Sequence, residues 1–330
     1  MFGKNFRQIG GGNMTVLMGS GKFTYEVFPD WAKLPKGWSF LEVVDVGVDA
    51  QDRVYVFNRG SHPLMIFDRE GNLLSAWGEG KFQRPHGLTM GPQDTLYLVD
   101  DGAHVVQHFT YDGQLLWTIG TPGKGAGFMS GRPFQQPTKV AIDDWTGELY
   151  IADGYGNARV HKFTSQGEYL FSWGESGTDP GQFNLVHSVA LDKKGLIYVA
   201  DRENHRLQVF DNQGKFVKQW VNMHRPCALH IAGKEEELIY IGELPPAYPF
   251  NQNYPNIGGR ISIYNLKGER LAILGDIQAG LQPHQFLAPH GLAVDSRGDI
   301  YVGEVSWSFR GKNLTPPREL PSFRKLVKVR

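Results

Sequence analysis

The sequence predicts an all-β fold, a six-bladed β-propeller of four-stranded antiparallel blades. The first observation behind this prediction is a repeat, in which a short apolar run around a tyrosine ends at a polar residue. Its six copies lie at 54–58, 96–100, 149–153, 197–201, 239–243 and 300–304. Successive tyrosines are 42, 53, 48, 42 and 61 residues apart. A period of about 40–50 residues is typical of a propeller blade or a solenoid unit.

The second observation is the order of strands within each repeat. An inner strand, such as 188–192, precedes the tyrosine strand, and a third strand, such as 206–210, follows a polar loop. A turn at Gln213-Gly214 then leads to a fourth strand at 216–220, because X-Gly pairs between apolar runs favour hairpins. Short runs of β-branched and aromatic residues are typical of strands. Each repeat therefore predicts one antiparallel blade.

The third observation is a mismatch between the two ends of the chain. The last repeat stops after a third strand at 325–329, whereas the run at 23–28 is one strand too many. Pairing this N-terminal strand with the C-terminal blade would close the ring and remove two exposed edges. An open solenoid would need no such exchange. We therefore expect a flexible leader at 1–22 and a single propeller domain at 23–330.

Two connections between second and third strands are unusually long. They lie at 244–259 and 305–323, and both are rich in proline and aromatic residues. Long loops in a compact fold are usually functional. Both leave the same face of the predicted disc, called the top face below. We expect them to act as lids there, and a purely structural role in covering the ring is the alternative.

Composition excludes several classes of function. Lys plus Arg and Asp plus Glu number 34 each, and no basic stripe interleaved with aromatics suggests nucleic acid. No run approaches the about 18 apolar residues of a spanning helix, and residues 1–22 lack the apolar core of a signal peptide. The single cysteine, Cys227, is typical of a reducing compartment. We expect a cytoplasmic protein with a small-molecule substrate and neither nucleic acid nor membrane as partner; the sequence leaves the oligomeric state open.

One position of the repeat carries histidine in alternate blades. It lies two residues before the apolar core of each inner strand. Its occupants in blades one to six are Asp45, His86, Thr138, His187, Cys227 and His290. Alternate blades of a six-bladed ring are about 120° apart, so the three imidazoles would converge on the axis. Three such ligands with an open fourth position suit a catalytic metal, zinc first and iron, manganese or copper after it.

The loops that follow the tyrosine strands would surround this metal. The tyrosine strands end on the face where the inner strands begin, because neighbouring strands of a blade are antiparallel. The loops that follow them therefore start on that face. The polar residues that they offer to a substrate pocket include Arg59, His62, Asp101, His104, Tyr155, Asn157, Arg202, Glu243 and Glu304.

Between residues 40 and 305 the chain resembles a known family, the peptidyl-α-hydroxyglycine α-amidating lyases, which are six-bladed NHL-type propellers. The segments that carry the resemblance are 56–60, 84–88, 152–157, 180–188, 200–204 and 289–290. In that family the matching histidines bind zinc, and the matching arginines and tyrosine surround the substrate. The resemblance thus implies a zinc site and a pocket in this chain. The ligands would be His86, His187 and His290, and the pocket residues Arg59, Tyr155 and Arg202.

The chain departs from the family at two positions. The family has an aspartate directly after the third histidine, where it helps to hold a structural calcium together with two carbonyls that map to Val46 and Leu88. This chain has Gly291 instead. A hard cation without a carboxylate is poorly neutralised, so we expect calcium to be absent or held differently. Ala288 replaces a family methionine, which would widen the pocket and change the substrate.

These residues lead to a hypothesis about the reaction. A metal-dependent lyase would cleave the C–N bond of an α-hydroxyglycine-like hemiaminal to an amide and a glyoxylate-type aldehyde, with the metal as Lewis acid. Tyr155 would be the base, made more acidic by the metal and Arg59. Arg202 or Arg59 would hold a substrate carboxylate.

Two other readings remain open. The same groups suit a metal-dependent hydrolase of a lactone or ester, or another elimination. A non-enzymatic NHL-type binding module ranks last, because it gives no reason for three histidines in alternate blades.

Overall fold

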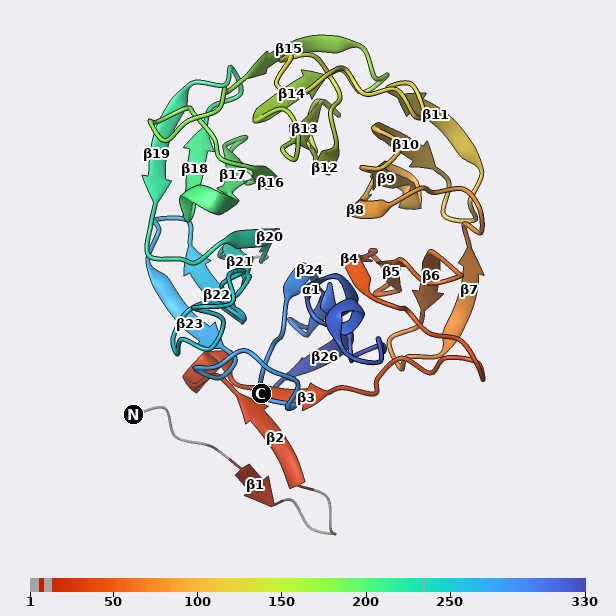
Figure 1. The fold of residues 1–330 in the computed structure, drawn as a ribbon, viewed down its shortest axis with the longest axis vertical. Coiled ribbons are helices and arrows are strands. Elements are labelled where there is room, and N and C mark those ends of the chain that lie inside the picture. Colours follow the sequence, from red (N-terminus) through yellow and green to blue (C-terminus); the bar gives the residue numbers. More distant parts are fainter. Residues whose placement is uncertain (1–5, 9–13, 234) are drawn as a thin grey trace.

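The strands of the chain form a ring of six blades around a central axis (Figure 1). The structure is a computed structural model that describes residues 6–8, 14–233 and 235–330. Five blades are four-stranded antiparallel sheets, and the sixth continues into further strands. The predicted fold class is therefore confirmed. The described helices are short: α1 (Ser306–Phe309), η1 (Gly21–Phe23), η2 (Pro92–Asp94), η3 (Arg202–Asn204) and η4 (Gly311–Asn313).

The first three blades each run outward from the axis in chain order. Blade one contains β4 (Val43–Val48), β5 (Val54–Asn58), β6 (Leu64–Phe67) and β7 (Leu73–Trp77). Blade two contains β8 (Pro85–Met90), β9 (Leu96–Asp100), β10 (Val105–Phe109) and β11 (Leu115–Ile119). Blade three contains β12 (Pro137–Ile142), β13 (Leu149–Asp153), β14 (Arg159–Phe163) and β15 (Tyr169–Trp173).

The next three blades follow the same order. Blade four contains β16 (Val186–Leu191), β17 (Ile197–Asp201), β18 (Arg206–Phe210) and β19 (Phe216–Trp220). Blade five contains β20 (Pro226–Ala232), β21 (Leu238–Glu243), β22 (Arg260–Asn265) and β23 (Arg270–Leu274). Blade six takes β24 (Pro289–Val294), β25 (Ile300–Glu304) and β26 (Phe323–Lys328) from the end of the chain.

The N-terminal strand closes the ring, as the sequence predicts. β3 (Tyr25–Phe28) pairs antiparallel with β26, with Val27 opposite Leu326. The same sheet continues through β2 (Met14–Met18) to β1 (Phe6–Gln8). Strand β2 therefore replaces part of the flexible leader expected at 1–22. The physical reason is that the free edge of β3 can pair with an apolar, β-prone run. Residues 1–5 and 9–13 of that expected leader lie outside the described residues.

The repeated tyrosine packs inside its blade, and in blades one, four and six its hydroxyl also anchors a loop. All six copies are at most 5% exposed: Tyr55, Tyr97, Tyr150, Tyr198, Tyr240 and Tyr301. The phenol of Tyr55 donates to Asp49 at 3.0 Å, and that of Tyr198 donates to Asp192 at 3.0 Å. Each of these carboxylates lies six residues before its tyrosine. A buried hydroxyl needs such a partner, and these bonds connect the tyrosine strands of blades one and four to the preceding loops.

Every inner strand begins with a β-bulge. His86, for example, is an extra residue between Pro85 and Gly87, which pair with consecutive residues of β9. The bulged residues of the six blades are Val44, His86, Thr138, His187, Cys227 and His290. A bulge re-aims the side chain of its extra residue. In three of these blades it carries the imidazole that the site is built from.

In blade one the residue at this position is Val44. The sequence prediction of Asp45 was one residue too late, because the apolar run of β4 already begins at Val43. Asp45 aligns instead with the residue after each bulge, such as Gly87 in blade two and Gly291 in blade six.

The two long connections lie beside the starts of inner strands. Residues 244–259 join β21 to β22, and residues 305–322 join β25 to β26. Leu244 donates its N–H to the Arg225 carbonyl, directly before β20, at 3.1 Å. Val305 donates to the Ala288 carbonyl, directly before β24, at 3.1 Å. In Figure 1, α1 overlies the inner part of blade six. Both insertions therefore border the end of the axis where the histidines lie.

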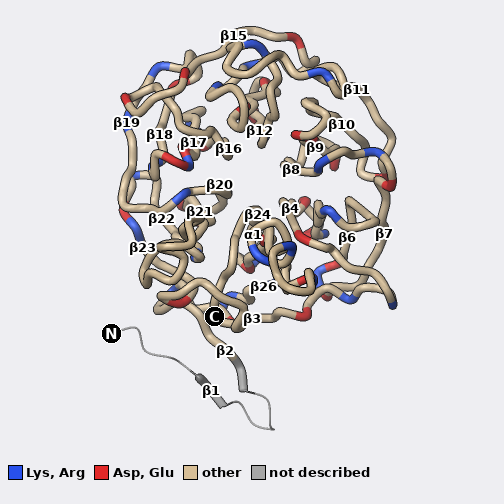
Figure 2. Tube along the Cα trace, viewed as in Figure 1, with Lys and Arg blue, Asp and Glu red and all other residues tan. Residues whose placement is uncertain are grey.

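Charges of both signs are interspersed around the ring (Figure 2), which agrees with a formal net charge of zero. Neither sign dominates one side of the ring in this view. Among the described residues, none of the helices has the length and apolar character to cross a bilayer.

Replacing Tyr25 by alanine tests the ring closure. Its side chain is fully buried on β3, whereas Phe28 on the same strand is 39% exposed. Removing a large buried aromatic side chain costs about 3–5 kcal/mol, so Tyr25→Ala should lower the free energy of unfolding in urea by that amount. Phe28→Ala is the matched control and should change it by about 0.5 kcal/mol or less. Equal effects of the two variants would contradict this role of β3.

Candidate metal centre

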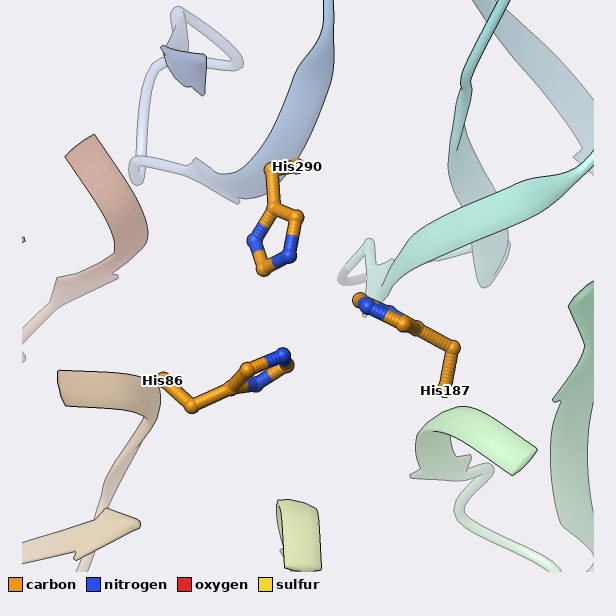
Figure 3. A group of neighbouring side chains, drawn as sticks. All are labelled: His86, His187 and His290. Carbon is orange, nitrogen blue, oxygen red and sulfur yellow. The ribbon is translucent and has the colours of Figure 1, made fainter. Parts of the chain in front are cut away.

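Three imidazoles meet on the propeller axis. His86 on β8, His187 on β16 and His290 on β24 place ring nitrogens within 4.8 Å of one another. Figure 3 shows the rings converging from three separate strands. Their centroids lie 4.7 to 5.0 Å apart, and all three residues are buried. The structure thus brings together the three residues that the sequence analysis assigned to a metal.

The Nδ1 atom of each imidazole bonds to a backbone carbonyl. Each acceptor is the bulged residue of the next blade around the ring. The pairs are His86 with Thr138 (2.8 Å), His187 with Cys227 (2.9 Å) and His290 with Val44 (2.7 Å). Because a carbonyl only accepts, Nδ1 must carry the proton, and Nε2 keeps its lone pair. This tautomer, fixed by an outer partner, is the one that a metal ligand needs.

Burial keeps these imidazoles neutral. Loss of solvation lowers the pKa of His86 and His187 well below the usual range and that of His290 to about 3. The positive charges of Arg59 and Arg202 act in the same direction. A histidine must be neutral to bind a metal, so the cluster is ready to do so at neutral pH.

The donor set fits a divalent transition metal. Zinc binds imidazole nitrogen at about 2.0–2.1 Å, which in a tetrahedral site places the nitrogens about 3.3 Å apart. Small side-chain rotations bring nitrogens that already lie within 4.8 Å to that separation. Three neutral imidazoles suit zinc, iron or copper. They leave a fourth position for a substrate or water.

The Tyr155 phenol lies against this cluster. Its oxygen is 3.2 Å from Nε2 of His86 and 3.1 Å from Nε2 of His187. The preceding residue, Gly154, allows the loop after β13 to come so close, because a Cβ there would lie 1.7 Å from the Val186 carbonyl oxygen. Burial raises the pKa of Tyr155, and the charge of Arg202 opposes that rise.

Two guanidinium groups flank the Tyr155 ring. The Cζ atoms of Arg84 and Arg202 are each 5.6 Å from the ring centroid. Arg202 is one of the residues predicted from the sequence, whereas Arg84 is not. The available signal was its position two residues before the ligand His86, inside a segment that carries the family resemblance.

The Arg59 side chain pairs with a buried carboxylate, and its predicted role beside the phenol stays a prediction. Its Nε donates to the Pro85 carbonyl at 3.0 Å, and its Nη1 donates to Glu42 at 2.8 Å. Glu42 is buried and also accepts from the Ser308 N–H at 2.6 Å. A buried carboxylate needs a cationic partner, which explains why Arg59 turns toward Glu42. Arg84 and Arg202 are the positive groups nearest Tyr155.

The Glu203 carboxylate holds the Arg202 side chain in position. Glu203 accepts from Arg202 Nε at 2.7 Å and from Arg225 Nη2 at 2.8 Å. Arg225 Nη1 donates to the Pro245 carbonyl in the first insertion at 3.0 Å. Burial raises the pKa of Glu203, but the hydrogen bonds and charges of the two arginines outweigh it and lower this pKa to about 2. Glu203 therefore stays ionised and links Arg202 to the insertion.

Asp101 is the predicted pocket residue whose carboxylate oxygens remain without a hydrogen bond. Both atoms are buried. The Arg84 Nη1 atom lies 3.0 Å from Oδ2, close enough for an ion pair although not aligned for a hydrogen bond. Burial raises the pKa of Asp101 to about 7, against the opposing charges of Arg84 and Arg59. A carboxyl group with this pKa exchanges protons near neutral pH.

The other five predicted pocket residues hold loops together. Their bonds, as far as the described residues show them, run to loop backbone or neighbouring side chains. The partners are Glu79 for His62, the Gln136 N–H for His104, the Gly131 N–H for Asn157, the His224 N–H for Glu243 and the Leu287 N–H for Glu304. Contact of these residues with a substrate stays a prediction.

In each blade that carries one of the three histidines, the tyrosine strand ends at an acidic residue. This residue holds the backbone that leads to the histidine. It accepts a backbone N–H two or three residues before the ligand. The pairs are Asp100 with Arg84 (2.9 Å), Asp201 with Asn184 (2.7 Å) and Glu304 with Ala288 (2.9 Å). The polar end of the repeat therefore anchors the segment that leads into the bulge.

The calcium site implied by the family does not fit these residues. A Cβ on Gly291, where the family has its aspartate, would lie 2.3 Å from the Cα of Asp45. The Lys139 ammonium donates to the Leu88 carbonyl at 2.5 Å and also contacts the Asp45 carboxylate. That carbonyl is one of the two expected calcium ligands, and a cation already occupies it.

Alanine in place of His187 tests the centre. Loss of one of three ligands should reduce the metal content of the purified chain from about one ion to far below that. Inductively coupled plasma mass spectrometry measures this content. His284→Ala is the control, because His284 pairs with Asp276 and keeps 29% of its side chain exposed. Equal metal content in the two variants would exclude the cluster as the binding site.

Asparagine in place of Asp101 tests its shifted pKa. A carboxyl group whose pKa rises on folding to about 7 binds more protons in the native state, so it lowers stability as pH increases from about 4 to 7. Asp101→Asn should remove this loss. Urea titrations at several pH values should show a slope flatter by up to about 1.4 kcal/mol per pH unit. An unchanged slope would contradict the assignment.

Comparison with known proteins identifies the family. The NHL repeat family model matches residues 134–163 and 183–210. The chain is 32% identical over 275 residues to mouse NHL repeat-containing protein 3, covering 76% of this chain and 73% of that protein. It is 31% identical over 292 residues to peptidyl-alpha-hydroxyglycine alpha-amidating lyase 1 of Drosophila melanogaster, covering 81% of this chain and 52% of that protein.

Solved structures agree on the fold. The structure of streptogramin B lyase has a TM-score of 0.55 at 12% identity and covers 92% of this chain and 89% of its own. That likeness extends to the fold alone, whereas the similarity in sequence extends to the family. The chain belongs to the NHL-repeat propellers, the family of NHL repeat-containing protein 3, and it is similar in sequence to a peptidyl-alpha-hydroxyglycine alpha-amidating lyase.

Proposed function

We propose that the chain is a metal-dependent lyase that cleaves the C–N bond of an α-hydroxyglycine-like hemiaminal. The products would be an amide and a glyoxylate-type aldehyde. The observation that carries this proposal is the Tyr155 oxygen, which lies within 3.2 Å of the Nε2 atoms of both His86 and His187. A half-buried phenol and three buried imidazoles therefore lie side by side, which supports a proton acceptor next to a metal site. The similarity to proteins named amidating lyases supports the same reaction.

A metal held by His86, His187 and His290 would act as a Lewis acid and lower the pKa of a substrate hydroxyl. Tyr155, as phenolate, takes the hydroxyl proton. The electrons of the O–H bond form the aldehyde C=O, and those of the C–N bond pass to the amide nitrogen. Tyr155 then returns its proton to that nitrogen, so atoms and charge balance without an oxidant.

Two arginines beside the Tyr155 ring act against the effect of burial. Burial raises the pKa of Tyr155, and this effect is larger than the opposing effect of the positive charges of Arg202 and Arg84. Both guanidinium groups stand over the ring at 5.6 Å. A metal held by the three histidines would add a further positive charge that lowers this pKa, which is what a base in this position requires.

Arg202 is placed to bind a substrate carboxylate. Its Nε atom bonds to Glu203 at 2.7 Å, and a guanidinium has four further N–H donors in a rigid fork. That fork matches a carboxylate in a way that an ammonium cannot. We therefore propose a small substrate that carries a carboxylate next to the hydroxyl-bearing carbon. We place the reaction in the cytoplasm, and the single, buried thiol of Cys227 supports this.

A hydrolase that acts on a lactone or ester is the second candidate. Asp101 favours it, because a buried carboxylate with a pKa of about 7 suits a general base that activates water. The two functions differ in their base. Loss of activity on lactones in Asp101→Asn but not in Tyr155→Phe would favour the hydrolase.

Phenylalanine in place of Tyr155 tests the lyase. The hydroxyl is lost and the ring remains, so release of glyoxylate from N-benzoyl-α-hydroxyglycine should fall by about 10²–10⁴-fold. Metal content should stay unchanged. Tyr111→Phe, at a 49% exposed residue in the turn between β10 and β11, should keep full activity. A Tyr155→Phe enzyme of normal rate would contradict the role of base, and one that lost its metal would make Tyr155 structural.

A further inference from the structure

A charge pair lies on the axis beneath the histidines. The Lys139 ammonium, from β12, contacts the Asp45 carboxylate, from β4, and donates to the Leu88 carbonyl of β8 at 2.5 Å. The same carboxylate accepts the Leu88 N–H at 2.7 Å and the Val46 N–H at 2.9 Å. The side chains of Lys139 and Asp45 are 15% and 7% exposed. Three consecutive blades are therefore tied together through one ammonium group.

Six residues, one from each inner strand, form a ring around the axis that includes this charge pair. These residues directly follow the six bulges, and they are Asp45, Gly87, Lys139, Ser188, Ala228 and Gly291. Gly291 leaves room for Asp45, because its Cβ would lie 2.7 Å from an Asp45 carboxylate oxygen. The ring therefore contains one carboxylate and one ammonium, so its formal charge is zero.

The space between this ring and the imidazoles is small. Its volume is about 10 Å³, and both charged side chains and all three histidines line it. A cavity of that size holds about one water molecule. Lys139 and Asp45 are therefore the charged residues that line this space below the three histidines.

A divalent ion would compete with the ammonium for the same oxygens. Calcium needs six to eight oxygen ligands at about 2.3–2.6 Å, including enough carboxylate to neutralise it. The carboxylate of Asp45 and the carbonyl of Leu88 are both bound by Lys139. Two cations in one buried site with a single carboxylate would repel each other. The ammonium therefore excludes the ion as long as it is present.

We propose that the Lys139 ammonium is a built-in cation that takes the place of a calcium ion on the propeller axis. The chain then holds its blades and its histidine centre in register without calcium. The inference stands independently of the proposed lyase reaction, because it concerns the charge beneath the centre and not the chemistry above it. It further implies that removal of the ammonium opens a calcium site at Asp45, Leu88 and Val46.

Methionine in place of Lys139 tests this inference. The variant keeps an unbranched side chain of similar length and removes the charge. Both proteins are loaded with their transition metal and dialysed free of calcium. The melting temperature of the wild type should not respond to millimolar calcium. Lys139→Met should melt several degrees lower, and millimolar calcium should restore most of that loss. Metal analysis should find calcium bound to the variant and none bound to the wild type.

Two controls make the result specific. Lys325 pairs with Asp299 at 3.2 Å in blade six, and its side chain is also buried. Lys325→Met should lose stability that calcium does not restore. The double variant Lys139→Met, Asp45→Asn should not respond to calcium either, because its carboxylate is gone.

Several outcomes would overturn the proposal. Calcium bound to the wild type, or a wild-type melting temperature raised by calcium, would show that Lys139 does not replace the ion. A folded Lys139→Met variant whose melting temperature does not change with calcium would also show that Lys139 does not replace the ion. A variant that needs calcium to fold supports the proposal, and one that fails to fold with or without calcium overturns it.

Discussion

The β-bulge at the start of each inner strand is the constraint on which the rest of the structure depends. One extra residue per blade turns six equivalent positions toward the axis, and histidine at every second position makes a three-fold cluster. The intervening positions contribute too, because their carbonyls accept the Nδ1 protons of the rings. Ligands and the groups that orient them thus come from one repeated feature of the backbone, and the metal centre is as rigid as the propeller.

The sequence was sufficient for the fold and for the histidines, because both follow from spacing. A tyrosine that recurs with the blade, and a surplus strand at one end, need no knowledge of contacts. The bulge is not visible in the spacing, and for that reason Asp45 rather than Val44 was placed at the histidine position of blade one. The roles of residues at the ends of the tyrosine strands and in the loops after them were harder to predict. Glu304 serves the backbone before His290, a role that only a folded loop reveals.

Charged groups lie on both sides of the imidazoles along the propeller axis. Guanidinium groups lie above the imidazoles, and a neutral carboxylate–ammonium pair lies below them. The positive groups above help to keep the histidines neutral and favour an anionic ligand at the open position. Glu203 and Glu42 hold Arg202 and Arg59 in place and connect the pocket to the two top-face insertions. In the proposed reaction, the same residues would select the charge of the substrate and assist proton transfer.

X-ray absorption spectroscopy on the purified, metal-loaded chain tests the central claim most directly. A metal on the axis should show three imidazole nitrogens at about 2.0–2.1 Å and one oxygen ligand completing a four-coordinate shell. The thiol of Cys227 lies 3.3 Å from His187 Nδ1, so a sulfur ligand at about 2.3 Å would mean a different centre. That result, or a shell made of oxygen alone, would contradict a site built from His86, His187 and His290.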